Sequence, residues 1–210
     1  MYLYMMNILL TESQYRRLLN EETNGLDNFI QKIVDAFPSV GEYTDIIKNN
    51  IEASNCQKIE FSDMSMAGGL SLHDRVVISN NFLNRNVSNL SGLLFVIFHE
   101  IAHQHQYNKY GKELIYDMYT GELEVEGAVG FLRYIENVAD QFSLRKCREL
   151  KKLGVIPEDQ QVRDTGGYDH YTDKMFEGYL NMLKSKVMKA GITKPDEISE
   201  LIYNLVKPKL

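Results

Sequence analysis

The sequence predicts an α+β protein that is mostly helical and has one small antiparallel sheet or hairpin. Apolar residues recur at helical spacing along most of the 210-residue chain. Between residues 58 and 80 this spacing gives way to short segments rich in β-branched residues, interrupted by Gly68 and Gly69. The apolar run LLFVIF at residues 93–98 follows and predicts a buried helix directly after the sheet.

The N-terminal part of the chain is predicted to be helical. Residues 1–10 are expected to form a first strand or an irregular start. The T-E-S-Q pattern that begins at Thr11 is typical of a capping box and predicts a short helix. Apolar residues at helical spacing predict a second helix over residues 26–36, and a further helical stretch is expected after Pro38, ending near residue 51.

Two β-strands are predicted ahead of the buried helix. Residues 58–61 and the RVVIS segment at residues 75–79 have the composition of strands, with His73-Asp74 as a plausible turn. Helices are then expected over residues 90–107, 126–153, 173–189 and 196–206. The polar residues 104–109 are typical of a solvated helix end.

These elements are expected to form one compact domain with three regions. An N-terminal helical region covers residues 1–57, a core with the sheet and the buried helix covers residues 58–153, and a C-terminal helical region covers residues 154–210. No internal repeat and no low-complexity tract interrupts this order.

Composition and charge exclude several classes of function. The chain is 44% hydrophobic and 25% charged, which is typical of a globular protein and not of a disordered one. Its net charge of −6 repels phosphate groups, so nonspecific binding to nucleic acid is not expected. No apolar run reaches the ~18 residues that a membrane span requires.

The compartment is expected to be the cytoplasm. Residues 1–10 are apolar but lack a positively charged start, and polar residues follow them where a cleavage site would lie, which argues against a signal peptide. The two cysteines, Cys56 and Cys147, are too few for a secreted disulfide framework and match no zinc-binding spacing. We therefore expect two reduced thiols.

One five-residue pattern, His-Glu-Ile-Ala-His at residues 99–103, has the spacing of a catalytic zinc site. Residues four apart on a helix lie on one face, so His99 and His103 can direct two imidazole nitrogens at one zinc ion. Glu100 lies beside that face and can remove a proton from a water on the metal. Because the preceding run is apolar, the motif is expected in a buried helix, where polar side chains without a function would be costly.

A catalytic zinc site needs a third protein ligand, and Glu136 is the best candidate. Glu136 and Asp140 are four residues apart on a predicted helix and are flanked by apolar residues. Glu136 can face the zinc, and Asp140 can accept a hydrogen bond from the far nitrogen of a ligating histidine. The pair Glu113 and Asp117 has the same spacing but follows His103 too closely to fold back beside it.

Other polar residues near the motif are expected to lie in solvent. Glu122, Glu124 and Glu126 fit a solvated helix start near the positive end of the helix dipole. His105 lies on the opposite side of the helix from His103 and is expected to be exposed.

HEIAH followed by ENVAD resembles the gluzincin pattern, HExxH followed by ExxxD. The short second motif, with Glu136, Ala139, Asp140 and Phe142, is most similar to the ImmA/IrrE-like peptidases and the minigluzincins. The resemblance covers about residues 58–150 and implies a zincin-like fold. It also implies zinc ligands at His99, His103 and Glu136, a base at Glu100 and a supporting role for Asp140.

The resemblance implies two further groups of site residues. An edge strand near residues 66–72, with Gly69, Leu70 and Ser71, would pair with an extended peptide substrate. Gluzincins usually carry a downstream tyrosine or histidine that stabilises the oxyanion, and one loop offers three candidates: Tyr168, His170 and Tyr171.

Together these patterns predict a zinc-dependent metallopeptidase that hydrolyses a peptide or protein with Glu100 as general base. One alternative is a catalytically silent regulatory or binding protein on the same scaffold, which would have no need of Glu100. The other is a purely structural zinc site, which would normally be closed by a fourth protein ligand.

Overall fold

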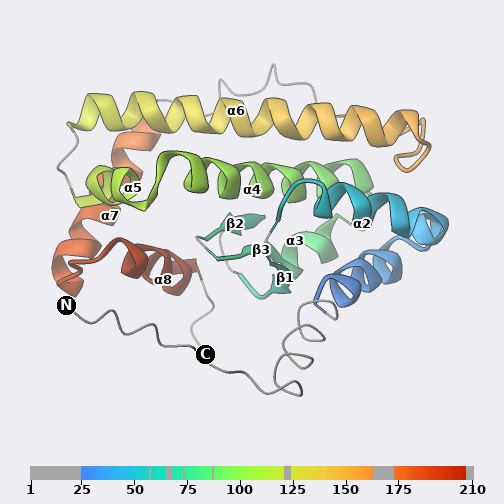
Figure 1. Ribbon diagram of the computed structural model, residues 1–210, viewed down its shortest axis with the longest axis horizontal. Helices are drawn as coiled ribbons and strands as arrows, with labels where there is room; N and C mark the ends of the chain where they lie inside the picture. The colour runs from blue at the N-terminus through green and yellow to red at the C-terminus, as the bar shows by residue number, and fades with distance from the viewer. Residues whose placement is uncertain are drawn as a thin grey trace, which may run out of the picture.

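Two long helices, α4 (Leu90–Tyr110) and α6 (Val125–Lys152), lie side by side and antiparallel, with α4 in the middle of the fold and α6 along its upper edge in Figure 1. The computed structural model describes residues 25–206 except residues 57, 65–67, 73, 87, 121–123 and 163–172. Ser143 on α6 donates a 2.9 Å hydrogen bond to the carbonyl oxygen of Phe95 on α4, which joins the two helices where their side chains are fully buried.

The sequence of α4 explains its central place. The Asn89 side chain accepts a hydrogen bond from the Gly92 amide and caps the start of the helix. Gly111, whose positive φ of 84° favours glycine, ends it. Between these ends the apolar side chains point in all directions, so the helix is stable only where other elements cover every side.

A three-stranded mixed sheet lies on the side of α4 away from α6 (Figure 1). Its strands are β1 (Ile59–Ser62), β2 (Gly69–Ser71) and β3 (Val76–Ser79), in the order β1-β3-β2. β2 pairs antiparallel with β3, but β1 pairs parallel with it. The expectation of an antiparallel sheet or hairpin was therefore wrong for β1. All four residues of β3 are buried, which suits a central strand with a partner on each edge.

The two faces of the sheet pack against different helices. Val76 and Ile78 of β3 belong to the main hydrophobic core with α4. Val77, on the opposite face, forms a smaller cluster with Leu70 of β2 and Tyr203 of α8 (Pro195–Val206). This alternation, with period two along the strands, places β2 between α4 and α8.

Shorter helices complete two larger cores. A helix over residues 25–36, η1 (Pro38–Tyr43), α2 (Thr44–Glu52) and α3 (Asn80–Arg85) surround the sheet end of the main core. α5 (Lys112–Thr120), α7 (Asp173–Ala190) and α8 form a second core with the first half of α6. The segment of α4 that carries His99 and His103 lies where these two halves meet.

The α+β class and the mostly helical character that the sequence predicts are confirmed. Helices α4, α6, α7 and α8 lie within three residues of their predicted bounds. Helices α3 and α5 were not predicted, and residues 1–24 lie outside the described part of the chain. Cys56 and Cys147 are both free thiols. Among the described residues, every helix is too short or too polar to cross a membrane.

Candidate metal centre

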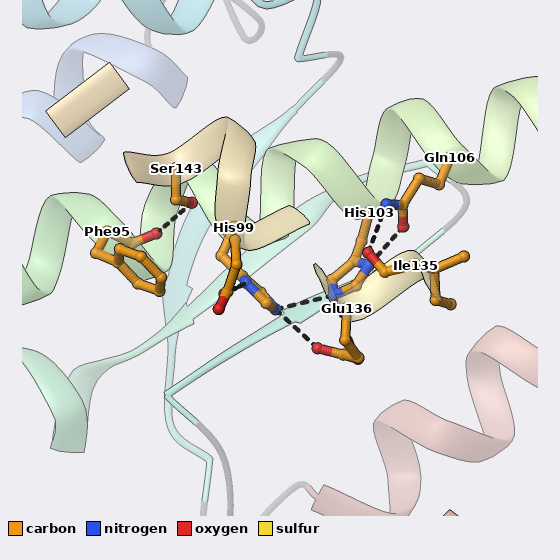
Figure 2. A network of polar contacts seen from close by, with 8 residues as sticks. Phe95, His99, His103, Gln106, Ile135, Glu136 and Ser143 are labelled. Carbon is orange, nitrogen blue, oxygen red and sulfur yellow. Dashed lines mark hydrogen bonds and ion pairs between the residues drawn. The ribbon is translucent and has the colours of Figure 1, made fainter. Parts of the chain in front are cut away.

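His99, His103 and Glu136 converge at the junction of α4 and α6 (Figure 2). The His99 and His103 Nε2 atoms are 2.9 Å apart. Glu136 places Oε2 3.2 Å from His99 Nε2 and Oε1 3.5 Å from His103 Nε2. The three side chains are 12%, 17% and 23% exposed, so the site is largely enclosed but open to solvent on one side.

Each histidine forms a hydrogen bond through its Nδ1 atom with a residue outside the cluster. The Nδ1 atom of His99 lies 2.9 Å from Oδ1 of the buried Asp140, and that of His103 lies 2.8 Å from Oε1 of Gln106. Gln106 donates through its Nε2 to the carbonyl oxygen of Ile135 at 2.7 Å, which leaves Oε1 as its acceptor. Both histidines therefore donate through Nδ1 and direct the Nε2 lone pair towards the site.

This arrangement fits a tetrahedral zinc ion. With metal–ligand distances of about 2.1 Å, neighbouring ligands of such an ion are about 3.4 Å apart, close to the distances among His99, His103 and Glu136. Two imidazole lone pairs and a carboxylate that face one another at this range repel unless a cation lies between them. The donor set of two nitrogens and one oxygen is that of a catalytic zinc site with one position left open.

In the metal-free protein, protons bound to the histidines supply the positive charge that balances Glu136. Burial opposes protonation of His99, but hydrogen bonds to Asp140 and Glu136 outweigh it and raise its pKa to about 10. Burial likewise opposes protonation of His103, and Glu136 again raises its pKa. The pKa of Glu136 is lowered, because the two histidines outweigh the effect of its burial.

The metal-free protein is expected to be most stable between pH 4.5 and 6.5, the ordinary pKa values of the two kinds of group. The raised pKa of His99 contributes stability that is complete below pH 6.5 and is lost as the pH rises towards about 10. The lowered pKa of Glu136 contributes stability that is lost as the pH falls below 4.5. Denaturant titrations of EDTA-treated protein on both sides of this window measure the effect. Stability that increased from neutral to alkaline pH would contradict it, and His99→Asn should flatten the alkaline slope.

Glu100 lies next to the site, and its side chain packs against strand β2 at Gly69. Burial raises the pKa of its carboxyl group, while the neighbouring histidines and a hydrogen bond from the Ser71 backbone oppose that rise. A Cβ atom at Gly69 would lie 2.5 Å from Cγ of Glu100. Of the three residues predicted to bind substrate, Gly69 and Ser71 thus contact Glu100, and the side chain of Leu70 packs on the opposite face of the sheet.

The three candidates for an oxyanion donor, Tyr168, His170 and Tyr171, lie outside the described residues. The described part of the chain offers another tyrosine pair, Tyr119 on α5 and Tyr179 on α7, whose ring centroids are 6.4 Å apart. Neither tyrosine could be singled out from the sequence, because neither belongs to a motif and α5 was not among the predicted helices.

The charge of the site affects the pKa values of both tyrosines. Burial raises the pKa of both hydroxyl groups, and the charge of Glu136 raises them further. The two hydroxyl groups are hydrogen-bonded to each other. Tyr179 is 39% exposed. The charge of Glu100 also raises the pKa of its hydroxyl group.

Several residues near the motif differ from expectation. His105 is half-buried and not exposed, because the far side of α4 packs against Ser54 and Phe142. Gln104 and Gln106 are buried, whereas Asn108 and Lys109 are exposed, so the solvated end of α4 is shorter than expected. The reason is the same in both cases: other elements cover α4 on all sides.

The acidic alternatives do not join the metal centre. Glu113 and Asp117 lie on α5, and the potential metal-binding group found among the described residues consists of His99, His103 and Glu136. Glu124 and Glu126 are exposed at the start of α6, as expected, and Glu122 lies outside the described residues.

Comparisons with protein-family models, with curated proteins and with solved structures find no match to this chain.

Proposed function

We propose that this protein is a zinc-dependent metallopeptidase with a zincin-like fold, related in its motifs to the gluzincins. The observation that carries the proposal is the convergence of His99, His103 and Glu136, with both imidazole lone pairs facing one carboxylate. Glu100 lies beside this group without belonging to it, which is the place that a general base requires.

A bound zinc ion would supply Lewis acidity, which lowers the pKa of a water molecule and polarises a carbonyl group. The residues of the chain then have separate tasks. Glu100 accepts the proton of the attacking water and passes it to the amine that leaves. Burial raises the pKa of Glu100 towards the range in which a carboxylate can both accept and release a proton near neutral pH.

Tyr179 is the described residue best suited to stabilise the oxyanion. Its hydroxyl group is hydrogen-bonded to Tyr119, and the charges of Glu136 and Glu100 both raise its pKa, which keeps the hydroxyl group protonated and able to donate. A donor in this position supports catalysis because it is already oriented before charge develops on the substrate.

The free edge of β2 is the proposed place for an extended peptide. β2 is an edge strand of the described sheet, because it pairs with β3 along one edge and with no other described strand along the other. Peptides bind such edges by adding a strand, and this edge lies beside Glu100.

The decisive experiment measures metal and cleavage on the same purified protein. We expect one zinc per chain, an anomalous-scattering peak between His99, His103 and Glu136, and cleavage of peptides in a mixed library that stops when the zinc is removed and returns when it is restored. Absence of zinc from the site would contradict the proposal. Stoichiometric zinc without any cleavage would instead favour a binding protein on this scaffold.

A further inference from the structure

The backbone groups of β2 alternate between its two edges. The carbonyl oxygen of Gly68 accepts from Ser79, and the amide of Leu72 donates to Arg75, at 2.9 and 2.8 Å. The backbone amide and carbonyl groups of the even-numbered residues in this segment therefore point towards β3. Gly69 and Ser71 direct their amide and carbonyl groups to the free edge, and their Cα substituents to the face covered by α4.

Gly69 leaves room for the base. A Cβ atom there would lie 2.5 Å from Cγ, 3.0 Å from Cδ and 3.0 Å from Oε1 of Glu100, so any side chain would displace the carboxylate. The φ angle of Gly69 is not in the left-handed region. The glycine thus serves the close approach of the strand to α4, and not a special backbone conformation.

Ser71 contacts the same side chain. Its backbone amide donates a hydrogen bond to Glu100. This amide faces the free edge, where it would otherwise be open to water or to a neighbouring strand. The donor is part of the sheet, so its position follows from the pairing of β2 with β3 and not from a flexible side chain.

We propose that strand β2 positions the Glu100 carboxylate through two neighbouring groups, the bare Cα of Gly69 and the backbone amide of Ser71. Gly69 and Ser71 are then positioning residues, because they act through Glu100. The effect on catalysis rests on the proposed function, whereas the contact between β2 and Glu100 does not. The two can be tested separately.

Hydrogen exchange tests the contact without metal or substrate. In the metal-free protein, the Ser71 amide should exchange slowly, and Glu100→Ala should accelerate its exchange at least about tenfold, the effect of losing a bond to a charged acceptor. The Leu72 amide, bonded to Arg75, is the internal control and should keep its protection. An unchanged Ser71 rate in a variant that keeps Leu72 protected would overturn the proposal. If Glu100→Ala disturbs the sheet, Glu100→Leu, which fills the same space but accepts no hydrogen bond, serves in its place.

Activity tests the consequence, with a fluorogenic peptide selected from a mixed library. Gly69→Ala should keep the zinc content, lower kcat at least about tenfold and leave KM within about twofold, because it displaces the base and not the peptide. In a protein that already carries Glu100→Gln, adding Gly69→Ala should not lower kcat any further. Gly130→Ala on α6 is the matched control, since a Cβ atom there meets nothing within 4 Å.

The outcomes separate the two proposals. Wild-type kcat in Gly69→Ala, together with an inactive Glu100→Gln, would overturn the positioning role and leave the metallopeptidase intact. Full activity in Glu100→Gln would overturn the metallopeptidase mechanism, while the exchange result would still decide whether β2 holds the carboxylate.

Discussion

Replacing Glu100 with glutamine is expected to lower kcat about 10³-fold, within the usual range for the loss of a general base. The glutamine side chain keeps the size of the original and its ability to accept from the Ser71 amide, but it cannot take a proton from water. Zinc content should not change, because Glu100 is not among the three residues whose ligand atoms converge. Initial rates on the selected peptide and zinc analysis of the same sample measure both effects.

The matched control removes a carboxylate elsewhere. Glu113→Gln makes the same change in charge and shape on the exposed side of α5, and should retain wild-type kcat. Loss of activity in both variants would point to a general effect of charge. Full activity in Glu100→Gln would exclude Glu100 as the base.

Replacing Glu136 with glutamine is expected to weaken zinc binding by more than about 100-fold, beyond the effect of changing a residue that only supports a ligand. The change removes the one negative charge among the three converging residues. It also removes the charge that raises the pKa of His103, so protons should compete less strongly for that histidine. Competition with a chromophoric chelator measures the affinity.

Glu126→Gln is the control on the same helix, because Glu126 lies exposed in the first turn of α6. Its zinc affinity should equal that of the unaltered protein. If Glu136→Gln also kept that affinity, the third ligand would have to be a different residue, and the role assigned to α6 would be wrong.

The sequence was most informative where function and local structure coincide. The spacing of His99 and His103 indicates one helical face, and the apolar run before them indicates burial, so α4 and its motif could be predicted together. Glu136 and Asp140 could be paired with the motif because their own spacing and apolar neighbours indicate a second buried helix. In the structure Asp140 lies behind His99, 2.9 Å from Nδ1.

Features that depend on contacts between distant segments could not be predicted. Nothing near β1 in the sequence indicates that it pairs parallel with β3, because the strand order is decided by the packing of the whole sheet. Gln106 was taken for a solvated residue, since its burial depends on α6, 29 residues away at Ile135. Gly69 was expected to contact substrate, and its closeness to Glu100 follows only from the approach of β2 to α4.

The bond between Glu100 and the Ser71 amide has a consequence for association between copies of this protein. An open strand edge with regularly spaced donors and acceptors is a template for pairing with another chain, which leads to aggregation. On β2 the carboxylate occupies one of the few outward donors of a three-residue strand. A strand that paired along the whole of this edge would have to compete with Glu100 for the Ser71 amide, whereas the outward groups of Gly69 stay open to a bound peptide. The residue proposed to activate water would therefore also protect the sheet from continuing into a neighbouring molecule, and Glu100→Ala should increase light scattering at high protein concentration.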